Sequence, residues 1–168
     1  LEKFQLEMVD EGWRVPTGAD GSKEQEPAEL ICNVRKYISP GNGRNPVTTY
    51  FLENLEYYEK RSNIYGYSDD AIRWALLARG VLEFLRSGRD RWVPDVIVSA
   101  DWQTGFLCSY LKSAYQHDPV LRNIATVFTV HNLYYQGMFD HRFVAEMDYD
   151  AGRGEVPNFF DSRLLKVN

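Results

Sequence analysis

Cysteine and histidine are scarce in this sequence. Its 168 residues include two cysteines, Cys32 and Cys108, and three histidines, His117, His131 and His141. Two cysteines far apart cannot build a disulfide framework, and neither residue type recurs at the spacing of metal ligands. The sequence therefore argues against a disulfide-stabilised domain and against a metal centre. We expect no metal and two cysteines that belong to the core.

Long apolar runs and clusters of basic residues are also missing. No stretch approaches the ~20 apolar residues that span a bilayer, and the N-terminal residues do not resemble a signal peptide. Nineteen Lys and Arg against 24 Asp and Glu give a net charge of −5, with no basic run to follow a phosphate backbone. We expect neither membrane nor nucleic-acid partners, and a cytoplasmic location or, in a plant, a plastid.

The usual phosphate-binding and hydrolase motifs are absent as well. The sequence has no Gly-x-Gly-x-x-Gly, no phosphate loop with Lys-Ser/Thr, and no spacing that suggests a Ser-His-Asp triad. What is present is a composition with 44% hydrophobic residues, enough to bury a core. Because the first residue, Leu1, is not Met, we expect the chain to be part of a longer protein.

The first half of the chain indicates a loop, two strands and a short helix. Residues 1–29 are polar and interrupted by Gly and Pro, and the segment GADGSKEQEP at 18–27 predicts a surface loop. Residues 30–38 and 47–52 are rich in β-branched and aromatic residues, which predicts two strands, either a hairpin or neighbours in a sheet. Residues 53–61 suggest a short helix.

The clearest helix is predicted to start near residue 68. Ser68 is a suitable N-cap, Asp69 and Asp70 fall in the first turn, and Gly88 is placed to end the helix. Its apolar face is marked by residues at three- and four-residue spacing: Ala71, Trp74, Ala75, Ala78, Leu82 and Leu85.

A strand–helix–strand unit follows. Residues 95–99 and 124–130 are short, nearly continuous apolar strands, typical of parallel sheets buried on both faces, and a helical stripe runs between them from Phe106 to Ala114. This pattern predicts an α/β fold with a Rossmann-like, mostly parallel sheet flanked by helices. Beyond residue 130 we expect loops and two short helices, at residues 142–147 and 159–167.

Polar side chains follow both of these strands. Asp101 and Trp102 come after the first strand, and His131 and Asn132 come after the second. Parallel strands place their carboxyl ends at one edge, where ligands bind, so these residues are expected to meet at a sugar site. Simpler interpretations stay open: Asp101 as a helix cap, His131 as a structural histidine, and Trp102 as a core residue.

Three blocks of this sequence resemble the glycogen/starch synthase family. The most specific block is the twelve-residue segment FTVHNLYYQGMF at 128–139. The second is Pro94-Asp95-Val96-Ile97 followed by Asp101-Trp102 and Gly105, and the third is Tyr65-Gly66-Tyr67 with Asp69-Asp70 and Arg73-Trp74.

The resemblance implies one half of a two-domain glycosyltransferase-B architecture. It implies a metal-independent enzyme that transfers glucose from ADP-glucose or UDP-glucose to the non-reducing end of an α-1,4-glucan, with retention. By the same resemblance His131 and Asp101 are the catalytic candidates. The substrate-binding candidates are Asn132, Tyr65, Trp102 and Gln136.

The sequence also departs from the family pattern. Ala100 and Gln103 stand where the family has histidines, and its Lys-x-Gly-Gly-Leu loop is missing. We therefore expect residues 1–168 to form a partial N-terminal domain without the C-terminal nucleotide-binding domain, inactive alone. Two alternatives stay open: a non-catalytic module that binds glucan or a partner protein, and a related retaining glycosyltransferase with another acceptor.

Overall fold

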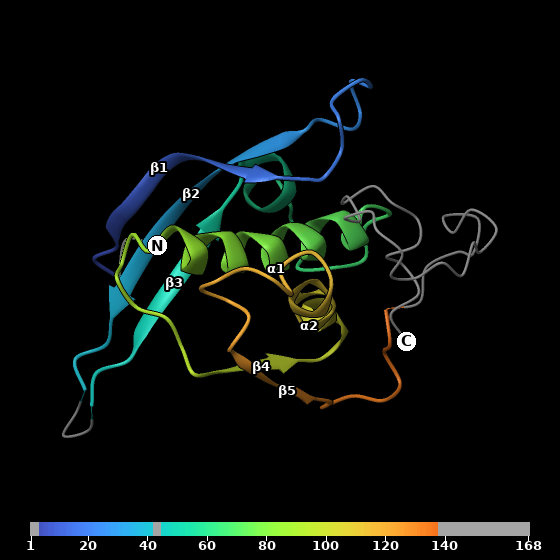
Figure 1. Cartoon of the computed structure of the whole chain (residues 1–168). Helices are drawn as coiled ribbons and strands as arrows, with labels where there is room; N and C mark the ends of the chain where they lie inside the picture. The colour runs from blue at the N-terminus through green and yellow to red at the C-terminus, as the bar shows by residue number, and fades with distance from the viewer. Residues whose placement is uncertain (1–3, 42–44, 138–168) are drawn as a thin grey trace.

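The computed structural model of this chain describes residues 4–41 and 45–137. Helices lie between a three-stranded sheet and a two-stranded sheet (Figure 1). In chain order the elements are β1 Glu7–Pro16, β2 Glu29–Ile38, β3 Thr48–Glu53, η1 Leu55–Glu59, α1 Asp70–Ser87, β4 Val96–Ala100, η2 Trp102–Thr104, α2 Gly105–Lys112 and β5 Ala125–Thr129. The helices predicted at 142–147 and 159–167 lie outside the described residues.

The first three strands form an antiparallel sheet in the order β1-β2-β3. Strands β2 and β3 pair antiparallel, with Val34 opposite Leu52, so the hairpin is the one of the two expected arrangements that forms. The surface loop predicted at 18–27 lies between β1 and β2 and is confirmed, but strand β1, which pairs with β2, is not indicated by the sequence pattern. The register of β1 shifts at Met8/Asp10 and again at Asp10/Trp13, and these bulges break the two-residue alternation by which a strand is recognised.

Helix α1 is the central element. Its buried face includes Ala75, Leu76 and Leu82, and Gly88 ends it in the left-handed conformation, as predicted. The predicted cap at Ser68 is wrong: the helix begins one residue later, with Asp69 at the N-cap position and no side-chain capping bond. The carboxylate of Asp70 instead accepts hydrogen bonds from the backbone just before the helix.

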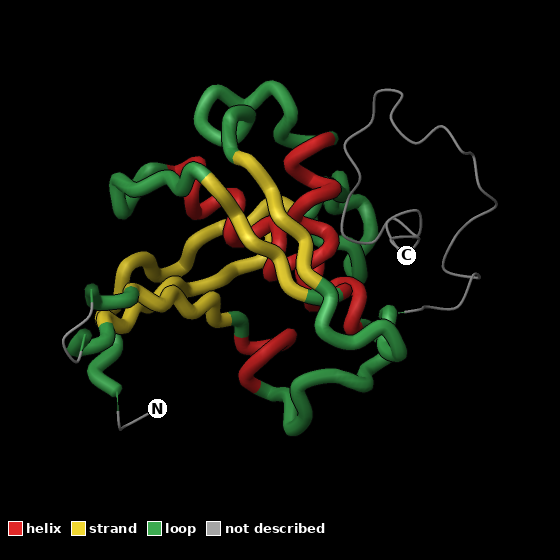
Figure 2. The backbone as a smooth tube through the Cα atoms, turned by 90° about the horizontal axis from the view of Figure 1, so that it is seen from below, coloured by secondary structure: helices red, strands yellow, loops and turns green. Residues whose placement is uncertain are grey.

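Strands β4 and β5 form a parallel pair in which Val98 lies opposite Val127. Helix α2 connects them and packs on one face of the pair, and α1 packs against α2. The opposite face carries Val96, Val98 and Val127, all exposed, so the prediction of strands buried on both faces is wrong for this chain. Figure 2, seen from below, shows the two strands in front of the helices.

Smaller features agree with the sequence in part. The predicted short helix is the π-helical turn η1, where the Asn54 side chain accepts hydrogen bonds from the N–H groups of Glu56 and Tyr57. Cys32 is a core residue, and burial raises the pKa of its thiol to about 11. Cys108 is only half-buried and contacts Ser99, so its predicted place in the core is wrong. In the described part of the chain no helix has the length and apolarity to cross a bilayer.

Candidate active site

The carboxyl ends of β4 and β5 bring Asp101 and His131 into direct contact. The backbone N–H of Asp101 donates to the carbonyl of Thr129 at 2.8 Å, which extends the strand pairing by one residue. One carboxylate oxygen of Asp101 accepts the backbone N–H of His131 at 2.7 Å, and the other lies 3.0 Å from Nδ1 of the imidazole. The predicted meeting of these two residues at one edge of the sheet is confirmed.

The backbone of Asp101 is strained. Its φ of 58° and ψ of 178° lie in a region that glycine alone adopts readily, and a side chain there costs about 1–3 kcal/mol. The helix-cap interpretation is wrong, because Asp101 makes no side-chain capping bond to the following turn η2. The carboxylate points across to the segment after β5 instead, so the strained backbone serves the contact with His131.

Hydrogen bonding keeps Asp101 charged and orients His131. The backbone N–H of His131 lowers the pKa of the Asp101 carboxyl, with the imidazole and the N–H of Asn132 adding to the effect against partial desolvation. A carboxylate only accepts hydrogen bonds, so Nδ1 of His131 must donate, which leaves Nε2 as the acceptor of a neutral ring. Because 67% of the His131 side chain is exposed, a ligand can reach the ring.

Four rings form an aromatic cluster beside this contact: Trp74, Trp102, Tyr135 and Tyr65. Trp102 meets Trp74 edge-on with ring centroids 6.2 Å apart, and Tyr135 edge-on at 5.7 Å. Tyr135 in turn lies 5.5 Å from Tyr65. Trp102 is therefore both a packing residue, through Trp74, and a wall of the site, through Tyr135.

Gly137 lets the segment after β5 approach Trp102 closely. Its φ is 61°, and a Cβ at this position would overlap the indole ring. Any other residue would force the ring or the segment to move. The loop that contains Asn132 and Tyr135 is thus held against Trp102 at its far end.

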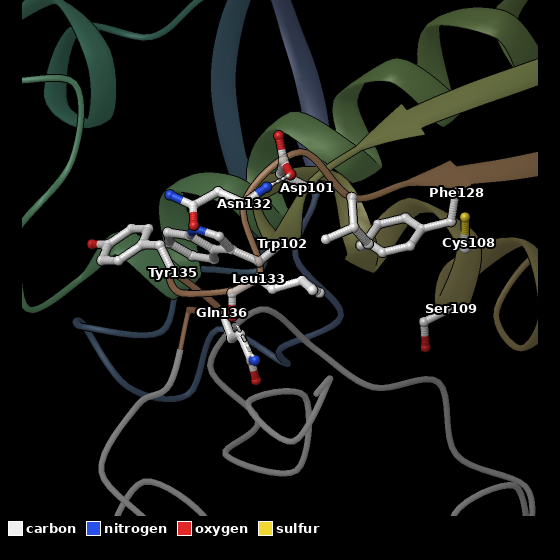
Figure 3. A pocket seen from close by; sticks show the side chains of 11 residues that line it. Asp101, Trp102, Cys108, Ser109, Phe128, Asn132, Leu133, Tyr135 and Gln136 are labelled. Carbon is white, nitrogen blue, oxygen red and sulfur yellow. Dashed lines mark hydrogen bonds between the residues drawn. The ribbon is translucent and has the colours of Figure 1, made fainter.

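Two adjoining pockets open at this edge. The first, of about 460 Å³, is lined by Asp101, Trp102, Gly105, Cys108, Ser109, Phe128, Val130, Asn132, Leu133, Tyr135 and Gln136. The second, of about 500 Å³, is lined by Tyr65, Asp101, Trp102, Gln103, Asn132, Tyr134 and Tyr135. In Figure 3 Trp102 and Tyr135 lie against each other, with Asn132 beside Asp101 and with Phe128 and Cys108 on the opposite side.

Every predicted site residue lies at this edge. Tyr65 lines the second pocket, Gln136 lines the first, and Asn132 and Trp102 line both. The Asn132 side-chain oxygen accepts the N–H of Tyr134 at 2.9 Å, and Gln136 Nε2 donates to the carbonyl of Leu133 at 2.7 Å. Both amides therefore shape the loop as well as line the pockets. Their predicted role in substrate binding stays a prediction.

The lining residues that were not singled out as site candidates from the sequence include Leu133, Tyr134 and Tyr135. Tyr134 is fully exposed and Leu133 is three-quarters exposed. The available signal was their place within the segment at 128–139, which also contains His131 and Asn132. Within residues 4–41 and 45–137, no three His, Cys, Asp or Glu side chains gather into a group that could hold a metal ion.

Comparison with known proteins now connects this geometry to a family. The family model of the starch synthase catalytic domain matches residues 10–163. The chain belongs to this family. It is 45% identical over 153 residues to a glycogen synthase of Exiguobacterium sibiricum. That alignment covers 87% of this chain and 28% of the relative. It is 39% identical over 132 residues to a glycogen synthase of Desulforamulus reducens, covering 79% and 23%.

A solved structure supports the fold. The catalytic domain of starch synthase IV from Arabidopsis thaliana, bound to ADP and acarbose, aligns with a TM-score of 0.58 and 24% identity. The alignment covers 79% of this chain and 24% of that chain. The predicted α/β fold, one part of a glycosyltransferase-B architecture, is confirmed. The prediction of a mostly parallel sheet is wrong for the described residues, where β1, β2 and β3 pair antiparallel and β4 with β5 is the parallel pair. This starch synthase family chain spans about a quarter of the length of its curated relatives, 28% and 23% for the two above.

Proposed function

We propose that the protein containing this chain is a glucosyltransferase of glycogen or starch synthesis. It transfers glucose from ADP-glucose or UDP-glucose to the non-reducing end of an α-1,4-glucan, with retention and without a metal. The Asp101–His131 contact at the carboxyl ends of a parallel strand pair, in a member of the starch synthase family, carries this proposal.

The chemistry of this contact fits a sugar site. Glucosyl transfer develops positive charge on the anomeric carbon and negative charge on the departing diphosphate. Asp101, ionised at neutral pH, places a negative charge beside the site and holds the imidazole with Nδ1 as donor. Nε2 of His131 is then an acceptor for a sugar hydroxyl, and the Trp102 and Tyr135 rings offer apolar faces to a pyranose.

The relatives support the same substrates. The similar proteins of Exiguobacterium and Desulforamulus are glycogen synthases, and the similar Arabidopsis structure holds ADP and acarbose. These ligands fit a nucleotide-sugar donor and a glucan acceptor for this protein. We propose a cytoplasmic location, or a plastid in a plant, and assign no oligomeric state.

The test is glucosyl transfer by the full-length gene product. ADP-glucose and UDP-glucose are offered separately with a maltooligosaccharide acceptor, and transfer from one or both is expected. His131→Ala should lower kcat/KM by about a hundred- to a thousandfold, the usual effect of removing one group that stabilises transition-state charge.

His117→Ala is the matched control, because His117 is an exposed histidine in the turn after α2. It should leave kcat/KM unchanged. If the folded wild-type protein transfers no glucose from either donor, the proposal is wrong. Glucan binding that survives His131→Ala would then favour a non-catalytic binding module.

A further inference from the structure

A buried carboxylate lies behind the exposed loop that carries Tyr65. Residues 61–67 lie in the connection between η1 and α1, and the side chain of Tyr65 lines the second pocket together with Asp101 and Asn132. The residues from 62 to 66 are exposed, whereas Asp70, at the start of α1, is only 3% exposed. The loop therefore depends on a few contacts for its conformation.

Asp70 makes the contacts that fix the end of this loop. One of its carboxylate oxygens accepts the backbone N–H of Gly66 at 2.6 Å and that of Tyr67 at 3.2 Å. The other oxygen accepts a hydrogen bond from Arg73, whose guanidinium is equally buried, at 2.5 Å. Three donors thus surround a group that can only accept.

These bonds differ from ordinary helix capping. A capping side chain accepts N–H groups of the first turn of its own helix. The N–H groups that Asp70 accepts belong to Gly66 and Tyr67, which precede α1. Gly66 and Tyr67 directly follow Tyr65 in the chain, so the carboxylate anchors the backbone next to the Tyr65 side chain.

Arg73, the other partner of the buried ion pair, contacts two aromatic rings near the same site. The Arg73 guanidinium lies 5.0 Å from the Tyr67 ring and 5.2 Å from the Trp74 ring. Trp74 in turn meets Trp102 edge-on, and Trp102 lines both pockets. One ion pair therefore supports the Tyr65 loop on one side and the aromatic cluster on the other.

We propose that Asp70 is a positioning residue, whose buried carboxylate fixes the Tyr65 loop and, through Arg73, the aromatic cluster at the candidate active site. The kinetic consequence of this inference rests on the proposed function. The hydrogen bonds from Gly66 and Tyr67 to Asp70, which we call the Asp70 clamp, are a property of the structure by itself. Both parts are tested together in the full-length protein.

Asp70→Asn is the direct variant. An amide presents its NH2 either to Arg73 or to the N–H groups of the loop, so one donor faces another whichever way it is turned. We expect faster hydrogen–deuterium exchange at residues 62–67. We also expect kcat/KM to fall by about ten- to a hundredfold, since a misplacement of about 1 Å can cost about a hundredfold. Asp10→Asn is the control, because Asp10 is also a buried carboxylate paired with an arginine, Arg89, but lies on β1 and does not contact this loop.

Gly66→Ala is the second variant, which keeps the proposal testable if Asp70→Asn does not fold. Gly66 has a φ of 102° with nothing within 4 Å of a Cβ, so alanine disturbs the loop backbone without touching the buried ion pair. The same two effects are expected. Gly12→Ala is its control, because Gly12, on β1, also has a positive φ and open space.

The outcomes separate the two proposals. A merely structural role would lower the melting temperature and leave kcat/KM unchanged in the folded protein. The positioning role is overturned if folded Asp70→Asn shows normal loop exchange and normal kcat/KM. If Asp70→Asn does not fold, the same result in Gly66→Ala overturns it. If the wild-type protein transfers no glucose, the proposed function fails, and loop exchange alone then decides the clamp.

Discussion

At the scale of single residues, Asp101 combines strained backbone with a charged side chain. Its three hydrogen bonds to the segment after β5 hold the carboxylate in place, and the backbone adopts a conformation suited to glycine. Strain of this kind persists where the surrounding structure enforces it, and it gathers at functional sites. The strained backbone of Asp101 therefore lowers the stability of the fold, and it places the carboxylate beside His131.

Two substitutions at Asp101 separate these contributions. Asp101→Ala and Asp101→Gly both remove the carboxylate, and both should lose glucosyl transfer. They differ in backbone tolerance, because glycine accepts a φ of 58° and alanine does not. We expect the glycine variant to be more stable than the alanine variant by about 1–3 kcal/mol.

Urea-dependent hydrogen exchange of the β4 and β5 amides measures this difference. Equal stability of the two variants would mean that the Asp101 backbone relaxes at no cost when the side chain is removed. A glycine variant that retained full transfer would contradict the role of the carboxylate.

Sequence reasoning reached the Asp101–His131 contact but not its geometry. Two apolar strands, each followed by a polar residue, suffice to predict that the residues meet. The positive φ of Asp101 and the approach of Gly137 to Trp102 depend on how the segment after β5 returns over η2, which strand pattern does not specify. The Asp70 clamp was missed because acids early in a helix usually indicate only a favourable dipole.

At the scale of elements, α1 connects the two sheets. It packs against β1 and β3 on one side and against α2 on the other. Arg79 and Glu83 on α1 also bind the Tyr115 hydroxyl, which joins the helix to the turn after α2, and burial raises the pKa of Tyr115. The helix therefore holds the first sheet and the α2 region, next to the candidate active site, in a fixed relative position.

Leu82→Ala tests how much the packing of α1 contributes to the stability of the fold. Leu82 is fully buried in the core, and truncating such a side chain costs about 2–5 kcal/mol. Leu55→Ala is the control, because Leu55 on η1 is 57% exposed and its loss should cost under about 0.5 kcal/mol. The opening free energy of the α1 amides, from urea-dependent hydrogen exchange, gives both values. If Leu82→Ala and Leu55→Ala lower the opening free energy by similar amounts, the packing of α1 is not a main source of stability.

Elements were predicted unevenly, and periodicity explains the difference. Helix α1 and the β4–α2–β5 unit have regular apolar spacing and were found. Strand β1 has register shifts and polar residues, so its pattern did not indicate a strand. That the first three strands form an antiparallel sheet of their own depends on the pairing of β1, so the sequence could not show it.

At the scale of the whole molecule, the outer face of β4–β5 is unusual. Val98 is 63% exposed and Val127, its partner in the register, is 47% exposed. Parallel sheets are ordinarily covered on both faces, and contiguous exposed apolar surface favours association. A recombinant chain of residues 1–168 is therefore expected to self-associate through this face.

Val98→Thr with Val127→Thr should shift such a chain toward monomer, since threonine keeps the strand preference and removes apolar surface. Val47→Thr is the control, because Val47 is also 63% exposed but lies before β3, away from this face. Sedimentation velocity measures the outcome. A wild-type chain that is monomeric, or a double variant that associates as strongly as wild type, would contradict the prediction.

The order of strand pairing has a consequence for biosynthesis. Among the described residues, β1 pairs with β2, β2 with β3, and β4 with β5, so each strand finds its partner among its neighbours in the chain. The antiparallel pairings of β1, β2 and β3 join strands that are close in the chain, and local pairings form early, whereas the parallel β4–β5 pair must wait for its crossover helix α2. During synthesis, where folding starts from the N-terminus, each sheet can assemble as soon as its last strand leaves the ribosome. The contact between Asp101 and His131 waits for β5, so the scaffold is in place before the chemistry it will hold.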